Sequence, residues 1–309
     1  SLAPKGLTQV HLNNSGAEAI EAAMKFARKF TGKKGMVAMK GSYHGKSFGA
    51  LSLTFNPKYR KAFAPLVEKV SFASFGDMDS LRSVIDEDTA FIILEPIQGE
   101  SGIIVAPDGF LQEVRKLCNE KGILLIFDEI QAGLGRTGRL WAGEHWNTVP
   151  DILCLAKGIA GGVPMGATLV RPDILAAISK GEHSSTFGGN PISCAAGIAA
   201  LKSITEDGLI ENSKKMGEMF REGLEKLKEK HTMIREIRGK GLMIGIEMKF
   251  EVKDILMGLI EEGVLMLYSG RNILRILPPL VINEEDVTKV LHALDIVIGR
   301  EEQKRNVQR

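Results

Sequence analysis

Apolar segments of two lengths alternate along the first three-fifths of the chain, and this alternation limits the possible folds most strongly. Short runs that are apolar throughout are typical of parallel strands buried on both faces. Between them, apolar residues recur at helical spacing, for example over residues 20–27 and 111–118. The pattern predicts an α/β fold with a mostly parallel sheet flanked by helices. The expected strands are residues 37–39, 90–94, 123–127, 152–155 and 167–170.

The pattern changes near residue 207, where strands and helices no longer alternate regularly. We therefore expect a large domain over residues 1–206 and a smaller C-terminal α+β domain over residues 207–309. The elements expected around and beyond this boundary are helices at 191–204 and 209–230, two strands within 234–248, a helix at 252–262, strands near 265 and 276, and a last helix from Glu284.

Charge and cysteine content exclude several classes of protein. The 309 residues carry 40 Lys and Arg against 38 Asp and Glu, and this balance argues against a nucleic-acid-binding surface. No apolar run is long enough to cross a bilayer, and residues 1–10 lack a signal-peptide pattern. The cysteines, Cys118, Cys154 and Cys194, are far apart, and the six histidines show no metal-ligand spacing. These features predict a cytoplasmic protein without a metal site.

Two glycine motifs resemble nucleotide-binding loops, but their context differs. Gly133, Gly135 and Gly138 form G-x-G-x-x-G, yet a polar stretch separates them from the preceding strand and no amphipathic helix follows. Residues 41–47 (G-S-Y-H-G-K-S) resemble a phosphate-binding loop with one residue too few between the glycines. We therefore expect no nucleotide site at either motif.

Three features indicate a site for a phosphorylated aldehyde cofactor. Ser15 and Glu18 form a capping box at a helix start, which either only caps the helix or also binds an anion. Asp128 and Lys157 each follow a predicted strand, where open α/β sheets bind ligands, although the two could also form a simple salt bridge. Tyr43 lies in a glycine-rich turn and offers a ring for stacking. Together these groups meet the needs of pyridoxal phosphate: an anion site, an amine, an acid and an aromatic plane.

Several longer motifs extend this interpretation to a family. The chain resembles the class III pyridoxal-phosphate aminotransferases of fold type I from Asn14 nearly to its C-terminus. This resemblance implies a large domain with a seven-stranded type of sheet, a smaller C-terminal domain, and greatest similarity to acetylornithine aminotransferases and to enzymes acting on carrier-protein-bound lysine or ornithine precursors. The motifs are N-S-G-A-E-A, Y-H-G-K-S, E-P-I-Q-G-E-S-G, F-D-E-I-Q-A-G-L-G-R-T-G, P-D-I-L-C-L-A-K, S-S-T-F-G-G-N-P and R-I-L-P-P-L.

The resemblance also implies which residues bind the cofactor. Lys157 would hold the aldehyde covalently and then move a proton, and burial and nearby positive charge would lower its pKa. Asp128 would pair with the ring nitrogen and Gln131 with a ring oxygen, while Tyr43 stacks on the ring. Phosphate contacts would come from the helix start and from the neighbouring subunit of a homodimer. The remaining cofactor-binding residues are Ser15, Gly16, Ala17, Glu129, Ile130 and Thr186.

Substrate contacts are implied in the same way. Arg275 would bind a substrate carboxylate, and Glu100 would pair with Arg275 when the bound amine offers no carboxylate there. Ser185 is a further substrate contact, and Glu95 orders the pocket. Lys46 stands where acetylornithine-type enzymes usually have an arginine, so it offers a point charge in place of a planar fork.

We therefore expect an enzyme that transfers a terminal amino group from N-acetylornithine, or a related lysine or ornithine intermediate, to 2-oxoglutarate with ping-pong kinetics. Alternatives are a putrescine (diamine) or 4-aminobutyrate aminotransferase, a decarboxylase or aminomutase on the same scaffold, and a cofactor-binding protein without transferase activity. The family normally has a further segment before the position of Ser1. We expect a chain without that segment to bind the cofactor weakly or to turn over slowly.

Overall fold

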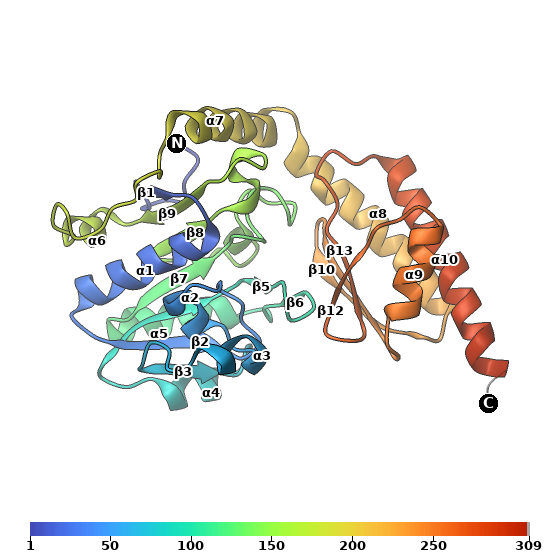
Figure 1. The fold of residues 1–309 in the computed structure, drawn as a ribbon, viewed down its shortest axis with the longest axis horizontal. Helices are drawn as coiled ribbons and strands as arrows, with labels where there is room; N and C mark the ends of the chain where they lie inside the picture. Colours follow the sequence, from blue (N-terminus) through green and yellow to red (C-terminus); the bar gives the residue numbers. More distant parts are fainter. Residues whose placement is uncertain (308–309) are drawn as a thin grey trace. The chain divides into compact units, whose positions relative to one another are not determined.

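The computed structural model describes residues 1–307, which form two compact units (Figure 1). The first unit comprises residues 1–98, 106–134 and 141–207. The second comprises residues 99–105, 135–140 and the chain from Gly208 on. Two short segments inside the first part of the sequence therefore group with the C-terminal part.

A seven-stranded sheet forms the centre of the first unit, in the order β1-β9-β8-β7-β4-β2-β3. The five strands from β8 to β3 run parallel, and four of the expected apolar runs lie in them. The prediction of an α/β fold with a mostly parallel sheet is confirmed. The strands are β1 (Gln9–Asn13), β2 (Gly35–Met39), β3 (Val70–Ala73), β4 (Thr89–Leu94), β7 (Leu124–Asp128), β8 (Ile152–Leu155) and β9 (Gly166–Val170).

One strand direction differs from the prediction. The run at 167–170 lies in β9, which pairs antiparallel with β8, so the expectation of a parallel strand there is wrong. All five residues of β9 are buried, and a strand buried on both faces is apolar whatever its direction. The sequence pattern did not predict β1, because four of its five residues are partly or fully exposed and three of the five are polar. It pairs antiparallel with β9 and therefore runs in the same direction as β8.

Helices cover this sheet. The helix α1 (Gly16–Thr31) packs an apolar face that includes Ile20, Met24 and Phe26 against the sheet, and Gly32 ends it in the left-handed conformation. The other helical elements of the unit are α2 (Phe48–Leu53), α3 (Pro57–Arg60), η1 (Lys61–Phe63), α4 (Met78–Val84), α5 (Phe110–Lys121), η2 (Ala142–Trp146), η3 (Lys157–Ala160), α6 (Pro172–Ala176) and α7 (Pro191–Glu206), and the short strand β5 (Ile97–Gln98) also belongs to it.

The second unit contains a four-stranded antiparallel sheet in the order β10-β11-β13-β12. Buried apolar side chains from the helices and from this sheet pack together and form a separate core. This core includes Phe220, Leu224, Ile246 and Leu294. The elements are β6 (Ile104–Val105), α8 (Leu209–Lys230), β10 (Ile234–Lys240), β11 (Met243–Met248), α9 (Lys253–Glu261), β12 (Leu267–Ser269), β13 (Ile273–Ile276) and α10 (Glu284–Val307). Within residues 1–307, no helix combines the length and apolar character needed to cross a membrane.

Candidate active site

Four neighbouring parallel strands of the first unit end at one edge of the sheet, and a residue expected at the site lies at or just after the end of each. Asp128 is the last residue of β7, and Lys157 lies two residues beyond β8. Glu95 follows β4, and Tyr43 lies in the turn after β2. Because these strands are adjacent and parallel, their carboxyl ends form one row. The topology therefore brings these four residues to one edge, as the sequence predicted for Asp128 and Lys157.

The start of α1 lies at the same edge. Asn13 at the end of β1 pairs with Gly166, and the neighbouring Ala167 pairs with Leu155 at the end of β8. A Cβ atom on Gly16 would lie 2.8 Å from the Cδ1 atom of Ile130, so the helix start packs directly on the stretch after β7. The absence of a side chain at Gly16 thus permits close contact with Ile130.

The capping box predicted from Ser15 and Glu18 is present. The Ser15 hydroxyl accepts a hydrogen bond from the Glu18 N–H at 3.3 Å, and the Glu18 carboxylate accepts one from the Asn14 N–H at 2.8 Å. The first N–H groups of a helix, here those of Gly16 and Ala17, have no carbonyl partner within the helix. Such groups, together with the helix dipole, suit a phosphate.

Asp128 is a buried carboxylate held on both oxygens. Its Oδ2 accepts a hydrogen bond from Nδ1 of His44 at 2.8 Å, and its Oδ1 accepts one from the Ile130 N–H at 3.0 Å. Asp128 and His44 are only 4% and 2% exposed, and the Nε2 atom of His44 has no hydrogen-bond partner among the described residues. Sequence reasoning did not assign a role to His44. The sequence feature that could have indicated His44 is its position beside Tyr43 in the same turn.

The stretch after Asp128 directs its side chains to different neighbours. The Glu129 carboxylate accepts hydrogen bonds from the N–H groups of Ala142 at 2.6 Å and Gly143 at 2.8 Å, at the start of η2. Burial raises the pKa of Glu129 to about 7, although these two hydrogen bonds oppose the rise. The Oε1 atom of Gln131 is buried and has no hydrogen-bond partner among the described residues. This amide oxygen is therefore suited to accept a hydrogen bond from a ligand.

Lys157 has an unusual backbone conformation. It is the first residue of η3 and has a φ of 46°, in the left-handed region that residues other than glycine rarely adopt. Strain of this kind persists where the surrounding structure holds it, often at functional sites. The Lys157 side chain is exposed in this chain. The reason is its position beyond the end of β8, at the edge of the sheet.

Tyr43 contacts Glu95 and Tyr59, and Tyr59 in turn contacts Lys46. The Tyr43 N–H donates a hydrogen bond to Oε2 of Glu95 at 3.2 Å, and Glu95 is buried. The Tyr43 ring meets the Tyr59 ring edge to face, with centroids 5.9 Å apart. The ammonium of Lys46 lies 4.8 Å from the centroid of the Tyr59 ring.

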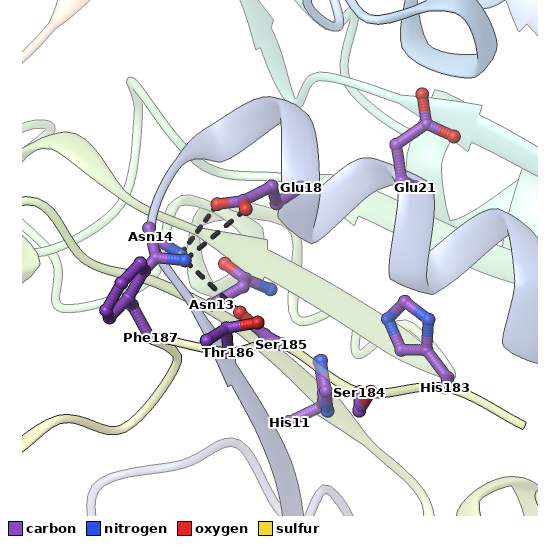
Figure 2. Close-up of a pocket in the computed structure, with 10 residues that line it drawn as sticks. All are labelled: His11, Asn13, Asn14, Glu18, Glu21, His183, Ser184, Ser185, Thr186 and Phe187. Carbon is purple, nitrogen blue, oxygen red and sulfur yellow. Dashed lines mark hydrogen bonds between the residues drawn. The ribbon is translucent and has the colours of Figure 1, made fainter. Parts of the chain in front are cut away.

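Ser185 and Thr186 line a cavity of about 390 Å³ beside the start of α1, together with Asn14 and Glu18 (Figure 2). The Asn14 side chain donates hydrogen bonds to the Ser185 hydroxyl at 3.2 Å and to Glu18 at 3.3 Å, as Figure 2 shows. Thr186 is exposed. The structure therefore places Ser185 at the helix start of its own chain and leaves the Thr186 side chain accessible.

Arg275 and Glu100 form an ion pair within the second unit. Arg275 lies on β13. Its Nη1 atom donates one hydrogen bond to Oε1 of Glu100 at 2.8 Å and another to the Gly99 carbonyl at 3.2 Å. Arg275 is 7% exposed and its Nε atom has no hydrogen-bond partner among the described residues, whereas the Glu100 side chain is 38% exposed.

The residues of the first unit fit pyridoxal phosphate. The start of α1 suits the phosphate, the buried carboxylate of Asp128 suits a protonated ring nitrogen, and the unpartnered Gln131 oxygen suits a ring hydroxyl. Within residues 1–307, no group of three or more His, Cys, Asp or Glu residues is arranged to hold a metal ion.

Known proteins match this chain over nearly its whole length. The acetylornithine aminotransferase of Caldanaerobacter subterraneus subsp. tengcongensis is 45% identical, over 94% of this chain and 76% of the relative. A LysW-aminoadipate semialdehyde/glutamate semialdehyde transaminase of Sulfurisphaera tokodaii is 42% identical, over 99% of this chain and 79% of the relative. The structure of the ornithine aminotransferase of Toxoplasma gondii, crystallised with oxidized glutathione and with PLP partly occupying its active site, superposes with a TM-score of 0.93 at 34% identity, over 96% of this chain and 74% of that one.

The family profile described as aminotransferase class-III matches residues 1–298. This match, the relatives and the shared fold confirm the resemblance on which the sequence interpretation depended. The chain belongs to the class-III aminotransferase family and is a pyridoxal-phosphate-dependent aminotransferase.

Proposed function

We propose that the enzyme transfers the terminal amino group of N-acetylornithine, or of a related lysine- or ornithine-pathway intermediate, to 2-oxoglutarate in two half-reactions. The observation that carries this proposal is the row of groups at the carboxyl ends of β8, β7, β4 and β2, beside the start of α1. The names of the relatives support the donor class, because they include acetylornithine, ornithine and LysW-linked semialdehyde aminotransferases.

Each cofactor-binding residue has a proposed role. Gly16 and Ala17 donate backbone N–H groups to the phosphate, and the Ser15 hydroxyl lies beside them at the helix cap. Tyr43 stacks on the ring, and Gln131 contacts the ring oxygen. The adjacent residues Glu129 and Ile130 shape this stretch: Glu129 anchors it to η2 and Ile130 packs on the helix start.

When bound, the cofactor supplies an electron sink for the carbon that carries the amino group. The chain's own groups then act on protons and charge. The amine of Lys157 binds the cofactor covalently and moves a proton at its Nζ atom. Asp128 keeps a positive charge on the ring nitrogen, and His44 holds the Asp128 carboxylate in place through its Nδ1–H.

Substrate recognition depends on residues of both charges. Arg275 binds a substrate carboxylate through its planar guanidinium, and Glu100 replaces that carboxylate when the bound substrate lacks one. Ser185 and Lys46 are further substrate contacts. A diamine such as putrescine, which has no carboxylate, is the second candidate donor, because the motifs Y-H-G-K-S, P-D-I-L-C-L-A-K and T-F-G-G-N-P also resemble those of putrescine aminotransferases.

We further propose a cytoplasmic homodimer in which Thr186 contacts the phosphate in the neighbouring subunit. The exposed apolar residues Phe187, Ile192 and Ile198, on and before α7, support a protein partner at this surface. The three cysteines are free, which agrees with a reducing compartment. We also propose residues 1–206 as the cofactor-binding domain and residues 207–309 as the smaller domain. The name of the LysW-linked relative supports a donor that is presented by a carrier protein.

Borohydride reduction followed by peptide mapping tests the covalent attachment. The cofactor should show its absorbance band, and reduction should add the cofactor mass to Lys157 alone. The matched control is Lys180→Ala, which removes an exposed lysine of the same unit and should leave the labelling unchanged. Labelling of any other lysine, or no labelling, contradicts the proposal.

Initial rates with 2-oxoglutarate and each donor separate the candidate substrates. N-acetylornithine should be preferred over putrescine and 4-aminobutyrate, with parallel lines in double-reciprocal plots because the kinetics are ping-pong. A clear preference for putrescine would overturn the donor assignment. Labelling of Lys157 without amino transfer to any acceptor would identify a cofactor-binding protein that lacks transferase activity.

A further inference from the structure

An ammonium group without a carboxylate partner lies over an aromatic ring near the row of strand ends. The Nζ atom of Lys46 is 4.8 Å from the centroid of the Tyr59 ring, and the Lys46 side chain is exposed. Among the residues that the structure describes, no Asp or Glu lies within ion-pair distance of this ammonium. The Tyr59 ring is therefore the contact that orients this charge within the chain.

The backbone on both sides of Lys46 is held in place. The Thr54 hydroxyl accepts a hydrogen bond from the His44 N–H at 2.9 Å and donates one to the Gly45 carbonyl at 3.1 Å. On the other side, the Ser47 hydroxyl donates to Glu21 of α1 at 2.6 Å. Because the chain is anchored before and after Lys46, the position of its ammonium depends on the side chain alone.

This turn lies against the proposed phosphate site. A Cβ atom on Gly45 would lie 3.0 Å from the Cβ atom of Ala17, so the turn packs directly on the first turn of α1. Gly45 also has a φ of 130°, a conformation that favours glycine. The backbone of Lys46 therefore lies next to the residues that we propose bind the phosphate.

Tyr59 links this cation to the ring that we assign to cofactor stacking. Its ring meets Tyr43 edge to face, with centroids 5.9 Å apart and an angle of 79° between the ring planes. Tyr59 belongs to α3, which begins with Pro57 and is capped by the Asn56 side chain at 3.0 Å. One aromatic side chain thus contacts both Tyr43 and Lys46.

We propose that Tyr59 is a positioning residue that holds the Lys46 ammonium ready for the carboxylate of the amino donor. An ammonium over a ring face is oriented, and an oriented charge loses less side-chain freedom when it pairs with a carboxylate. A diamine would instead bring a second positive charge to this group, and like charges repel. Tyr59 and Lys46 together would then select ω-amino donors that carry a carboxylate over diamines. This inference rests on the proposed function and names the donor class that the site prefers.

Steady-state kinetics of Tyr59 and Lys46 variants test the inference. Tyr59→Leu removes the ring face and should raise KM for N-acetylornithine about two- to fivefold, the worth of an exposed cation–π contact, without changing kcat. Tyr59→Phe keeps the ring face and should behave like the unaltered enzyme. KM for putrescine should not rise in either variant. Tyr268→Leu, which removes an exposed tyrosine of the second unit, is the matched control.

The double variant shows whether Tyr59 acts through Lys46. In a Lys46→Met background, Tyr59→Leu should have no further effect on KM for N-acetylornithine, because the charge that the ring positions is gone. If Tyr59→Leu raises KM equally for both donors, lowers kcat, or has the same effect without Lys46, its role is structural and the inference is wrong.

Calorimetry separates this inference from the donor assignment. N-acetylnorvaline keeps the carboxylate end of N-acetylornithine but lacks the reacting amine, so its binding to the cofactor-loaded enzyme requires no turnover. Its Kd should rise about two- to fivefold in Tyr59→Leu and stay unchanged in Tyr59→Phe. A Kd that is unaffected by Tyr59→Leu overturns the inference even if N-acetylornithine is a substrate. A changed Kd supports it even if no transfer from N-acetylornithine occurs.

Discussion

Two acidic residues of this enzyme are hydrogen-bonded in very different surroundings. Asp128, in the first unit, is 4% exposed, and its partner His44 is equally buried. Glu100, in the second unit, pairs with Arg275 at a similar distance, 2.8 Å, but its side chain is 38% exposed. The two contacts have the same length and different access to water.

This difference in access decides how easily each partner can be exchanged. A buried carboxylate that loses its partner keeps the full penalty of desolvation, so Asp128 and His44 favour one fixed arrangement. The Glu100 carboxylate can move into water because its side chain is 38% exposed, and a substrate carboxylate would then take its place beside the buried Arg275. The first arrangement suits a cofactor that stays bound. The second would suit the exchange of substrates that we propose at Arg275.

The largest expected effect tests the fixed arrangement. Asp128→Asn removes the buried negative charge and should lower kcat about 10²- to 10³-fold, the usual cost of losing one preorganised electrostatic partner. Cofactor absorbance, measured on the same samples, separates loss of binding from loss of rate. The exposed Asp79→Asn is the control and should be fully active. A kcat within tenfold of the unaltered enzyme would show that Asp128 does not act on the cofactor.

Glu129 provides a second test of the buried region, through stability. Its pKa of about 7 in the folded chain exceeds the ordinary value of 4.5, so the folded state binds this proton more tightly than the unfolded state does. This contribution to the free energy of unfolding is complete below about pH 4.5 and is lost as the pH rises through 7. The loss amounts to about 3 kcal/mol.

Glu129→Gln should remove this pH dependence. Urea denaturation at each pH gives the free energy of unfolding of both chains. The excess of the unaltered chain over the variant should fall by about 3 kcal/mol between pH 4.5 and 7. The exposed Glu113→Gln serves as the control. A difference that stays constant over this range would show that Glu129 is ionised throughout it.

Arg275→Lys tests the exchangeable region. Lysine keeps the charge but loses the planar fork, so KM for 2-oxoglutarate should rise about tenfold while kcat changes little. Arg271→Lys, at an exposed position before β13, is the matched control in steady-state assays. An unchanged KM would assign carboxylate binding to another residue.

The smallest effect is expected at Glu100. Glu100→Gln removes the charge that competes with the substrate carboxylate for Arg275, so KM for 2-oxoglutarate should fall two- to fivefold, as expected for a half-exposed pair. Glu251→Gln controls for the loss of one negative charge at the surface. A rise in KM above tenfold would mean that Glu100 positions Arg275 permanently, and the contrast between the two regions would disappear.

Hydrophobic pattern predicted most elements of this fold because their burial is regular. The helix expected at 209–230 is α8, and the run at 152–155 is β8. Residues 9–13 lacked such a signal, since β1 is largely exposed at the edge of the sheet. The direction of β9 was also hidden, because burial makes a strand apolar in either direction.

The motifs and strand ends in the sequence were sufficient to select Asp128 and Lys157 and to indicate a class III aminotransferase, because each of these signals is local in the chain. Only the tertiary structure decided which groups those residues meet. The hydrogen bond from His44 to Asp128 joins positions 84 residues apart, and the contact of Lys46 with Tyr59 depends on how α3 folds back on the turn that contains Lys46. Such contacts follow from strand order and side-chain direction, and neither is encoded in the spacing of apolar residues.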